Sequence, residues 1–334
     1  MEDRILLAHG SGGKLAHDLI EKSFVPVLDN PLLAPLDDSA VFEMSGRLAF
    51  TTDSYVVSPI FFPGGDIGKL AVCGTVNDLS MSGAKPLYLS LAFIIEEGLL
   101  LKDLQRVIDS IRDTAEEAGV KIITGDTKVV ERGSADKIFI NTAGIGKIPE
   151  GITISGSNAK PGDKIILSGT VGDHGIAVLS RRQGLSFGTK LESDCAPLGK
   201  IVAEMLAASR NIHSLRDPTR GGLATTLNEL AKQSKVGIRI EESKIPVRDE
   251  VAGACEMLGL DPLYIANEGK LIAIVTREDA DKILTAMKRN RYGQNAVVIG
   301  EVIAEHPGRV VMKTVLGSSR IVDMLVGEPL PRIC

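Results

Sequence analysis

The chain has 334 residues, a length that exceeds one ordinary compact domain and predicts two domains of about 150 residues each. Hydrophobic residues make up 44% and charged residues 24%, which excludes a disordered or fibrous protein. The formal charge is 38 minus 43, or −5, which disfavours a broad basic surface for nucleic acid. The acidic start lacks a secretory signal, and no apolar stretch reaches the roughly 20 residues of a membrane span. We therefore expect a cytoplasmic protein that binds neither nucleic acid nor membrane.

Strands and helices are mixed in the first half of the chain. Helical periodicity predicts helices over residues 14–27, 68–81 and 104–118, and β-rich composition predicts strands over 47–52, 86–95, 120–124 and 138–145. Gly119 follows the third helix, as a C-terminal cap does. Turn residues near 150 separate this half from the next. We therefore predict a first α+β domain over residues 1–150.

The second half repeats this mixture. Strands are predicted over 164–168, 237–240, 271–275 and 296–302, and helices over 175–182, 198–209, 223–234, 249–258 and 279–290. This pattern predicts a second α+β domain over residues 151–324. Residues 325–334 hold two prolines and a glycine, which cannot continue a helix or a central strand. We predict that they form a mobile tail that ends in Cys334.

Acidic side chains recur at positions that suit a magnesium–nucleotide site. Asp37 precedes a short apolar strand, Asp53 and Asp126 directly follow predicted strands, and Asn77 and Asp78 lie within a predicted helix. Mg²⁺ takes one or two carboxylates together with phosphate oxygens, so a dispersed set of this kind fits it. Each residue alone is more often a turn or helix cap, so the prediction rests on the set. We predict that the four aspartates bind the metal and that Asn77 contacts the nucleotide.

Two glycine-rich loops precede predicted helices and could bind phosphate through backbone N–H groups. The first comprises His9, Gly10, Ser11, Gly12 and Gly13, and the second runs from Asp217 through Arg220 to Gly222. The first does not match the spacing of a P-loop, so that reading is excluded. A flexible arm for the first loop and a capped turn for the second are equally compatible with the residues.

Three further residues suit the chemistry of group transfer. Lys128 follows Asp126 and Thr127 closely and could neutralise a phosphoryl group, although a solvated lysine is the usual alternative. Glu268, before a predicted strand, could act as a general base or simply belong to a turn. Cys334 stands at the end of the predicted tail, where a thiolate would be a mobile nucleophile. The other cysteines form no zinc-binding spacing, and we expect them to be packed.

Four ordered motifs resemble the aminoimidazole ribonucleotide synthetase (PurM-like) superfamily of ATP-binding enzymes. They are Asp37-Asp38-Ser39-Ala40, Thr51-Thr52-Asp53-Ser54, Asn77-Asp78-Leu79-Ser80-Met81-Ser82-Gly83-Ala84-Lys85-Pro86 and Gly125-Asp126-Thr127. Within the superfamily, the glycine loop at 9–13, residues 125–131, 217–223 and 267–270, and above all Pro331-Arg332-Ile333-Cys334, resemble the carbamoyl dehydratases that mature hydrogenases. The resemblance spans both predicted domains. It implies a two-domain PurM-like fold whose N-terminal domain forms a homodimer through its sheet.

The resemblance also implies a reaction that uses ATP and Mg²⁺. Cys334 would receive a carbamoyl group from the carbamoyltransferase HypF, and ATP would phosphorylate the carbamoyl oxygen. Loss of phosphate would leave an S-cyano group, which would pass to iron on the HypC–HypD scaffold as the cyanide ligand of a NiFe hydrogenase. Phosphorylation is needed because hydroxide is a poor leaving group. Glu268 would remove the N–H protons, and Lys128 would stabilise charge on the phosphoryl oxygens.

Two other interpretations remain open at this point. One is a sibling enzyme of the superfamily, such as selenophosphate synthetase, thiamine-phosphate kinase or the purine enzyme itself. The first of these carries Cys or selenocysteine in its glycine loop, whereas residues 9–13 here hold no thiol, and none of the three calls for a terminal Cys. The other is a nucleotide-binding adaptor whose tail is only a docking peptide. A docking peptide would tolerate Cys334→Ala, whereas a covalent carrier would not.

Overall fold

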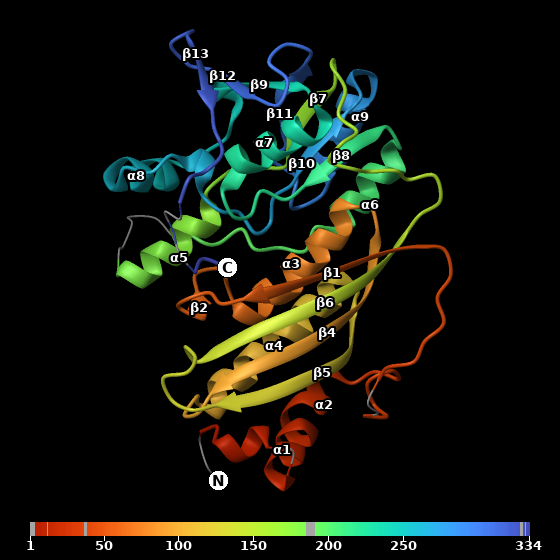
Figure 1. Cartoon of the computed structure of the whole chain (residues 1–334), viewed down its shortest axis with the longest axis vertical. Helices are drawn as coiled ribbons and strands as arrows, with labels where there is room; N and C mark the ends of the chain where they lie inside the picture. Colours follow the sequence, from red (N-terminus) through yellow and green to blue (C-terminus); the bar gives the residue numbers. More distant parts are fainter. Residues whose placement is uncertain (1–3, 12, 37–38, 185–190, 328–329, 331) are drawn as a thin grey trace.

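A computed structural model describes residues 4–11, 13–36, 39–184, 191–327, 330 and 332–334. Two β-sheets, one from each half of the chain, are stacked end to end along the long axis of the molecule (Figure 1). This arrangement confirms the predicted α+β class. The predicted boundaries at residues 150 and 324 stay predictions. None of the helices in the described ranges is both long and apolar enough to cross a membrane.

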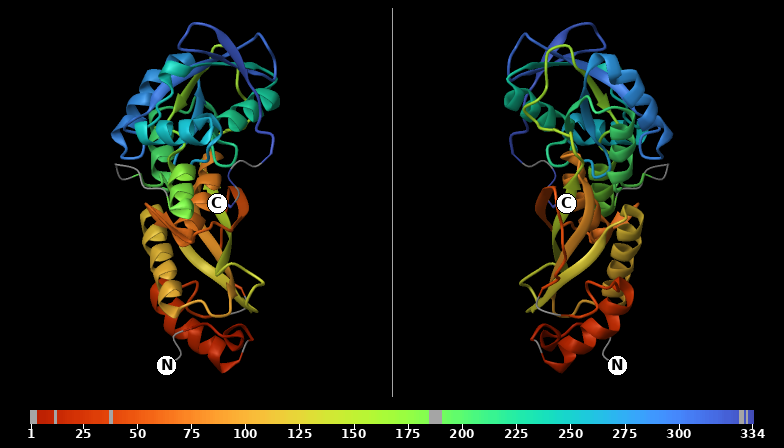
Figure 2. Two further views of the ribbon diagram at one scale, coloured as in Figure 1. Left: turned by 90° about the vertical axis from the view of Figure 1, so that its left-hand side faces the viewer. Right: turned by 90° about the vertical axis from the view of Figure 1, so that its right-hand side faces the viewer.

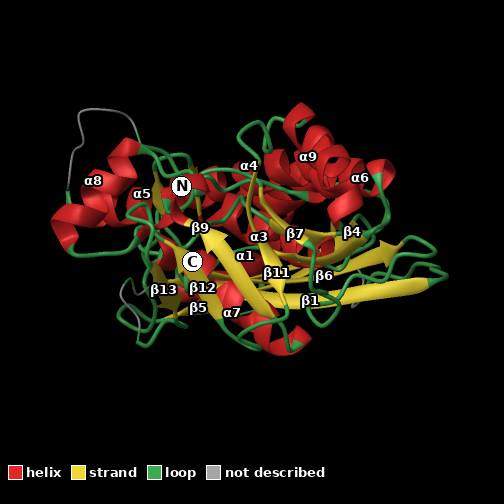
Figure 3. Cartoon of the chain, turned by 90° about the horizontal axis from the view of Figure 1, so that it is seen from above, coloured by secondary structure: helices red, strands yellow, loops and turns green. Residues whose placement is uncertain are grey.

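The N-terminal sheet has four strands in the order β1-β6-β4-β5. The strands are β1 (Arg47–Tyr55), β4 (Lys85–Glu96), β5 (Lys121–Val130) and β6 (Ile138–Ile148), and only β4 and β5 pair in parallel. Helices α3 (Ile67–Met81) and α4 (Leu101–Ala118) cover one face, as Figures 2 and 3 show from two directions. No helix of the described chain covers the other face, on which Phe50 is 71% exposed.

The two covering helices follow from the local sequence. Helix α4 buries Leu104, Val107, Ile108 and Ile111, which recur every three or four residues and so share one face. It ends at Gly119, whose φ of 71° is the left-handed conformation that glycine adopts readily. Helix α3 is buried over nearly its whole length because it lies between the sheet, α4 and the second domain. Both predicted helices are thereby confirmed.

The C-terminal sheet has seven strands in the order β13-β12-β9-β11-β7-β10-β8. The strands are β7 (Lys164–Leu167), β8 (Ile212–Arg216), β9 (Gly237–Glu241), β10 (Ile272–Val275), β11 (Val297–Ile303), β12 (Val310–Lys313) and β13 (Ser319–Val322). The accompanying helices are α5 (Asp173–Gln183), α6 (Gly199–Ala208), α7 (Gly222–Ser234), α8 (Asp249–Leu258) and α9 (Ala280–Arg289). All five helices were predicted. Strands β8, β12 and β13 were not.

The structure also corrects the first predicted helix, over residues 14–27. It is divided into α1 (Lys14–Leu19), one π-helical turn (Ile20–Phe24) and α2 (Val25–Leu28). Pro26 explains the division, because its ring removes one N–H donor and clashes with the carbonyl of the preceding turn. Two short strands, β2 (Phe61–Phe62) and β3 (Gly65–Asp66), form a small hairpin before α3.

Candidate functional site

Four carboxyl groups from separate elements meet where the two domains join, and we call them the acid cluster: Asp53, Asp78, Asp217 and Glu268. Asp53 of β1 and Asp78 of α3 lie on the helix-covered side of the sheet, where Thr51 donates a hydrogen bond to Asp78 Oδ2 at 2.9 Å. Burial raises the pKa of Asp78, and the neighbouring Asp53 raises it further. Burial also raises the pKa of Asp217 to about 7, with added repulsion from Asp78 and Asp53.

Glu268 is the most enclosed member of the acid cluster, with 3% of the residue exposed. Its Oε1 atom has no hydrogen-bond partner among the described residues. Burial raises the pKa of Glu268 well above the ordinary value, and the charges of Cys195 and Asp217 add to this effect. Burial therefore makes this carboxylate a stronger base than that of an exposed glutamate.

Two buried asparagines fix the position of Glu268. Asn77 of α3 donates to the carbonyls of Ala196 at 3.1 Å and Glu268 at 3.3 Å, and its Oδ1 accepts from Leu198 N–H at 2.7 Å. Asn267 donates to the Pro218 carbonyl at 3.0 Å. We predicted that Asn77 contacts the nucleotide, but in this structure both polar atoms of its amide are occupied by the second domain. Asn77 therefore acts as a joint between the domains.

The acid cluster fits a divalent cation that also has phosphate ligands. Among the residues that the structure describes, no group of three His, Cys, Asp or Glu side chains could hold a metal by itself. Asp53 nevertheless lies close enough to Asp78 to raise the pKa of that carboxyl, although the Thr51 hydrogen bond and the Arg216 charge lower it. Mg²⁺ requires no more from a protein when phosphates supply the other oxygens. Asp37, also predicted as a ligand, lies outside the described residues.

Asp126 does not join the acid cluster. It was predicted to follow a strand, but β5 continues to Val130, and the prediction that Asp53 follows a strand is wrong for the same reason. Asp126 and Lys128 pair with Ala92 and Ile94, which puts both on the uncovered face of the sheet. There Lys128 Nζ lies 2.7 Å from Asp126 Oδ1 and lowers the pKa of that carboxyl. The two predicted groups are therefore on the opposite face from Asp53.

The first glycine-rich loop packs against the edge of the sheet. His9 is buried and accepts a hydrogen bond from Leu6 N–H at 2.9 Å, and Ser11 donates to the Ala8 carbonyl at 3.0 Å. A Cβ atom on Gly10 would lie 2.4 Å from the backbone nitrogen of Val129, so close packing explains this glycine. Gly13 precedes the six-residue helix α1 and has open space around it. Gly12 lies outside the described residues.

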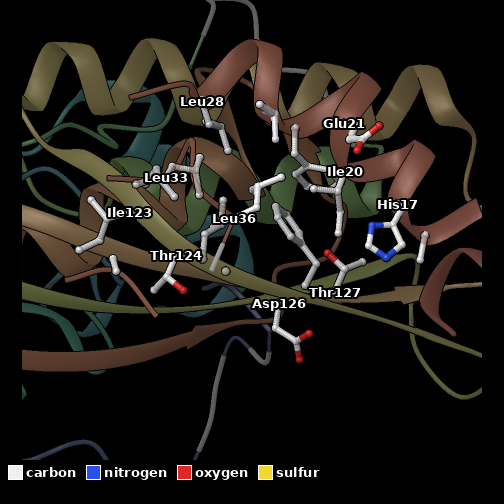
Figure 4. A pocket seen from close by; sticks show the side chains of 18 of the residues that line it. His17, Ile20, Glu21, Leu28, Leu33, Leu36, Ile123, Thr124, Asp126 and Thr127 are labelled. Atoms are coloured by element: carbon white, nitrogen blue, oxygen red, sulfur yellow. The ribbon is translucent and has the colours of Figure 1, made fainter. Parts of the chain in front are cut away.

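A cavity of about 340 Å³ lies between the N-terminal helices and β5. Apolar side chains form most of its wall, with Thr127 and His17 at one end (Figure 4). Figure 4 shows Asp126 pointing away from these apolar side chains, on the other side of the strand. Cys334 and the acid cluster are absent from the residues that line the cavity. The cavity is therefore separate from the acid cluster.

The second glycine-rich loop places Asp217 in the acid cluster and leaves Arg220 exposed. Gly221 has a φ of 78° and precedes α7. A Cβ atom on Gly222 would lie 2.6 Å from the carbonyl oxygens of Leu263 and Ile265. The two glycines thus let the chain turn and pack closely, as the capped-turn interpretation requires. The arrangement also carries Asp217 toward Glu268.

The last residues of the chain lie between the domains, next to β2 and α5 (Figure 1). Ile333 is 3% exposed, and Cys334 packs against a core that includes Tyr55. Val56 N–H donates to the Cys334 carbonyl at 3.3 Å, and Ser58 N–H donates to the Arg332 carbonyl at 3.2 Å. The last three residues of the predicted tail are thus docked in this structure, and the mobility of the tail stays a prediction.

Tyr55 lies next to both Cys334 and the acid cluster. Val56, which binds the Cys334 carbonyl, follows Tyr55 at the end of β1. Burial raises the pKa of Tyr55, and the charges of Asp53, Glu268 and Asp78 raise it further, so this phenol lies within electrostatic range of three acid-cluster members. Tyr55 therefore contributes to the surroundings of both Cys334 and the acid cluster.

Sequence analysis missed several residues around the docked tail. His174 and Arg182 of α5 contact its backbone, and Lys270 forms a buried ion pair with Asp194 at 3.1 Å. One signal was available for His174: Gly172 and Asp173 form a glycine turn that opens α5, much like the two loops that we did single out. Nothing local in the sequence distinguishes Arg182 from a surface arginine.

Comparison with known proteins identifies both domains. Residues 36–148 match the N-terminal domain of AIR synthase related proteins, and residues 160–313 match the C-terminal domain. The carbamoyl dehydratase HypE of Cupriavidus necator is 54% identical over 99% of this chain and 95% of its own length. The HypE protein of Rhizobium leguminosarum bv. viciae is 55% identical over the same shares.

Solved structures agree with these relatives. A crystal structure of the hydrogenase maturation protein HypE in complex with ATP has a TM-score of 0.96 and 53% identity, and covers 98% of this chain and 99% of its own. A HypE–HypF complex contains a chain with a TM-score of 0.82 and 52% identity, covering 92% of this chain and 99% of its own. The chain therefore belongs to the HypE family of carbamoyl dehydratases, enzymes of hydrogenase maturation that are built from the two AIR synthase related domains.

Proposed function

We propose that this chain dehydrates a carbamoyl group bound to the sulfur of Cys334, using ATP, and so makes the cyanide ligands of a NiFe hydrogenase. The S–C(=O)–NH₂ group becomes S–C≡N, and the carbonyl oxygen leaves as part of inorganic phosphate. ATP becomes ADP, and the two N–H protons are lost from nitrogen. The observation that supports this proposal above all is the seating of Cys334 beside the acid cluster.

The residues of the acid cluster have separate roles in this reaction. Glu268, held in a buried position without a partner for Oε1, takes an N–H proton as phosphate leaves. Asp53 and Asp78 would hold Mg²⁺, with Asp37 as a further predicted ligand, and the ion would supply charge neutralisation for the phosphates of ATP. Asp217 and Arg220 stay predicted nucleotide contacts, as do residues 9–13 and Thr127.

Lys128 enters the site only if a second copy supplies it, because it lies on the opposite face of the sheet from Asp53. That face exposes 71% of Phe50, 48% of Leu48 and 46% of Ile94. An uncovered apolar sheet face of this kind is typical of an association surface. We propose a homodimer through this face, in which Asp126 and Lys128 of one copy approach the nucleotide bound by the other.

The proposed partners follow from the chemistry and the relatives. The carbamoyl donor is HypF, and the solved complex of a 52% identical HypE with HypF supports this assignment. The cyanide acceptor is iron on HypC–HypD. Because the carrier is a thiol, we propose that the protein works in the cytoplasm, where thiols stay reduced. The structure of a 53% identical HypE with ATP supports ATP as the phosphoryl donor.

The decisive experiment follows Cys334 by mass. The purified protein is incubated with HypF, carbamoyl phosphate and ATP, and the mass of the peptide that contains Cys334 is measured by mass spectrometry. We expect the gain of a carbamoyl group, followed by loss of one water only when ATP can be hydrolysed. Cys334→Ala should show neither change, and Cys255→Ala, at a buried cysteine of α8, should behave as wild type. An unmodified Cys334 alongside continued ATP hydrolysis would instead indicate a sibling enzyme with a different acceptor.

A further inference from the structure

The docked tail is held through its backbone as well as through the Arg332 side chain, which donates to the Val56 carbonyl at 3.0 Å and pairs with Asp136 at 2.9 Å. Arg182 Nη2 donates to the Arg332 carbonyl at 2.6 Å, and His174 Nε2 lies 2.9 Å from the Ile333 carbonyl. With the bonds from Ser58 to Arg332 and from Val56 to Cys334, three successive carbonyls each have a donor. We call the four donors Val56, Ser58, His174 and Arg182 the tail seat. Two come from the segment after β1 and two from α5, so the tail seat combines both domains.

His174 is the enclosed member of the tail seat, with none of its surface exposed. A carbonyl oxygen can only accept, so Nε2 must carry the hydrogen that meets Ile333. Nδ1 is then an acceptor, and Ser193 Oγ lies 2.8 Å away as its donor. Ser193 Oγ in turn accepts from Cys195 N–H at 3.1 Å. The ring also packs edge-on against Phe62, with 5.4 Å between centroids.

These contacts leave His174 with one tautomer and one orientation, and its only outward donor is aimed at the tail. If the tail leaves, Nε2–H loses its partner inside a buried place, and an unpaired buried donor is costly. An aliphatic side chain would fill the same space without that cost. The buried His174 donor of α5 is therefore explained by its hydrogen bond to the tail backbone.

We propose that His174 is a positioning residue that sets the register of the Cys334 thiol in the active site. This proposal rests on the proposed function, because it assumes that Cys334 carries the reacting group. His174 does not touch the sulfur, but it fixes the carbonyl one residue before it. Misplacement by about 1 Å costs on the order of 100-fold in rate when reacting groups must meet, so one backbone contact can matter.

The test compares His174→Leu, which removes the donor, with His174→Gln, whose amide N–H can replace Nε2–H. His306→Leu, at an exposed loop between β11 and β12, is the matched control. HypF first charges each protein with carbamoyl phosphate. The rate of water loss from the charged Cys334 peptide is then measured in a single turnover, together with the KM for ATP.

We expect His174→Leu to slow water loss by about tenfold or more, with an unchanged KM for ATP. His174→Gln should recover most of the rate. Carbamoylation by HypF should not slow in either variant, because the proposal gives His174 a role in water loss and not in charging. A wild-type rate of water loss in His174→Leu would overturn the proposal, as would an equal loss in His174→Leu and His174→Gln.

A second measurement separates this proposal from the proposed function. Alkylation of Cys334 by iodoacetamide, without HypF or ATP, reports how often the thiol leaves its seat. We expect His174→Leu to accelerate alkylation several-fold and His306→Leu to leave it unchanged. If His174→Leu does not fold, Ser193→Ala removes the group that orients the ring, together with the acceptor for Cys195 N–H, and should give a smaller acceleration. Alkylation that is equal in all folded variants would overturn the proposal even if Cys334 proves to be carbamoylated.

Discussion

The two faces of the N-terminal sheet carry carboxylates in opposite electrostatic states. On the helix-covered face, burial and Asp53 raise the pKa of Asp78, so negative charge there is only partly offset by Thr51 and Arg216. On the uncovered face, Lys128 lowers the pKa of Asp126, so that carboxylate already has its cation. This difference indicates what would bind to each face. A cation would stabilise the carboxylates of the covered face, whereas a second protein surface would enclose the ion pair of the uncovered face.

The largest effect should come from Glu268, beside the covered face. Glu268→Gln keeps the size and burial of the side chain but removes the base, so we expect water loss from the carbamoyl group to fall by about 1000-fold. Carbamoylation of Cys334 by HypF should continue. The single-turnover mass assay measures both steps. Glu256→Gln, at an exposed position of α8, serves as the control, and an undiminished rate in Glu268→Gln would remove this residue from the mechanism.

Lys128 on the uncovered face should have the next largest effect. Lys128→Ala removes charge stabilisation at the phosphoryl group, and we expect a loss of about 100-fold. If Lys128 acts across the dimer, mixing Lys128→Ala with Glu268→Gln should restore about a quarter of the wild-type rate, because half of the dimers are mixed and each has one intact site.

This mixing experiment tests directly whether the two faces cooperate between copies. Mixed dimers form by co-refolding or slow exchange, and each variant alone is the baseline. If mixing restores nothing although mixed dimers are present, Lys128 and Glu268 would have to act within one chain. That outcome would contradict the arrangement on opposite faces of the sheet. Phe50→Lys, on the uncovered face, should lower the dimer fraction in sedimentation and reduce activity with it.

Substitution of Asp78 should have a smaller effect, which raises stability and lowers the affinity for ATP with Mg²⁺. Its pKa is raised in the fold, so the ionised group destabilises the protein at pH 8, and this cost is absent below its folded pKa. Asp78→Asn keeps an acceptor for Thr51 and should raise the free energy of unfolding slightly without metal. The same change should weaken binding of ATP with Mg²⁺ by about tenfold. Urea unfolding and calorimetric titration measure the two effects, and a stabilised variant with unchanged affinity would exclude Asp78 as a ligand.

The smallest effect concerns the pH dependence of stability. Burial lowers the pKa of His174, while Asp194 and the Ile333 carbonyl oppose that shift. The unfolded chain therefore binds this proton first, near pH 6.5, and stability present above that pH is lost as the pH falls through it. Between pH 7.5 and 5.5 the wild type should lose about 1 kcal/mol more than His174→Gln. Urea unfolding at both values measures the difference, and identical losses would mean that His174 does not titrate differently on folding.

The sequence predicted elements well where apolar spacing repeats, as in α4. It predicted them poorly where pairing with a neighbouring strand decides whether a segment forms a strand. Strand β13 has three exposed residues out of four, so no alternation marks it, and it forms because β12 lies beside it. Asp53 and Asp126 interrupt apolar runs and so looked like strand ends, since aspartate has low strand propensity. Backbone pairing of Asp53 with Thr142 and of Asp126 with Ala92 overrides that preference.

The candidate site was predictable as a set of residue types, but not as a geometry. Motif residues such as Asp53, Asp78 and Glu268 could be named from the sequence, yet only strand register shows that Asp126 lies on the other face. The meeting of Asp217 with Glu268 depends on the bond from Asn267 to the Pro218 carbonyl, across 49 positions. Contacts of this separation leave no local signal, and neither does the contact of His174 with Ile333.

Because the tail docks beside the acid cluster, the docking of the tail and the binding of ATP are expected to affect each other. Tyr55 borders both places, and Asn77 joins α3, which carries Asp78, to the loop of Glu268. If nucleotide occupancy changes the seated fraction of the tail by some factor, the seated tail must change nucleotide affinity by that same factor. A measurement of ATP affinity with and without the last three residues would therefore report, through reciprocity alone, how strongly ATP draws the thiol inward.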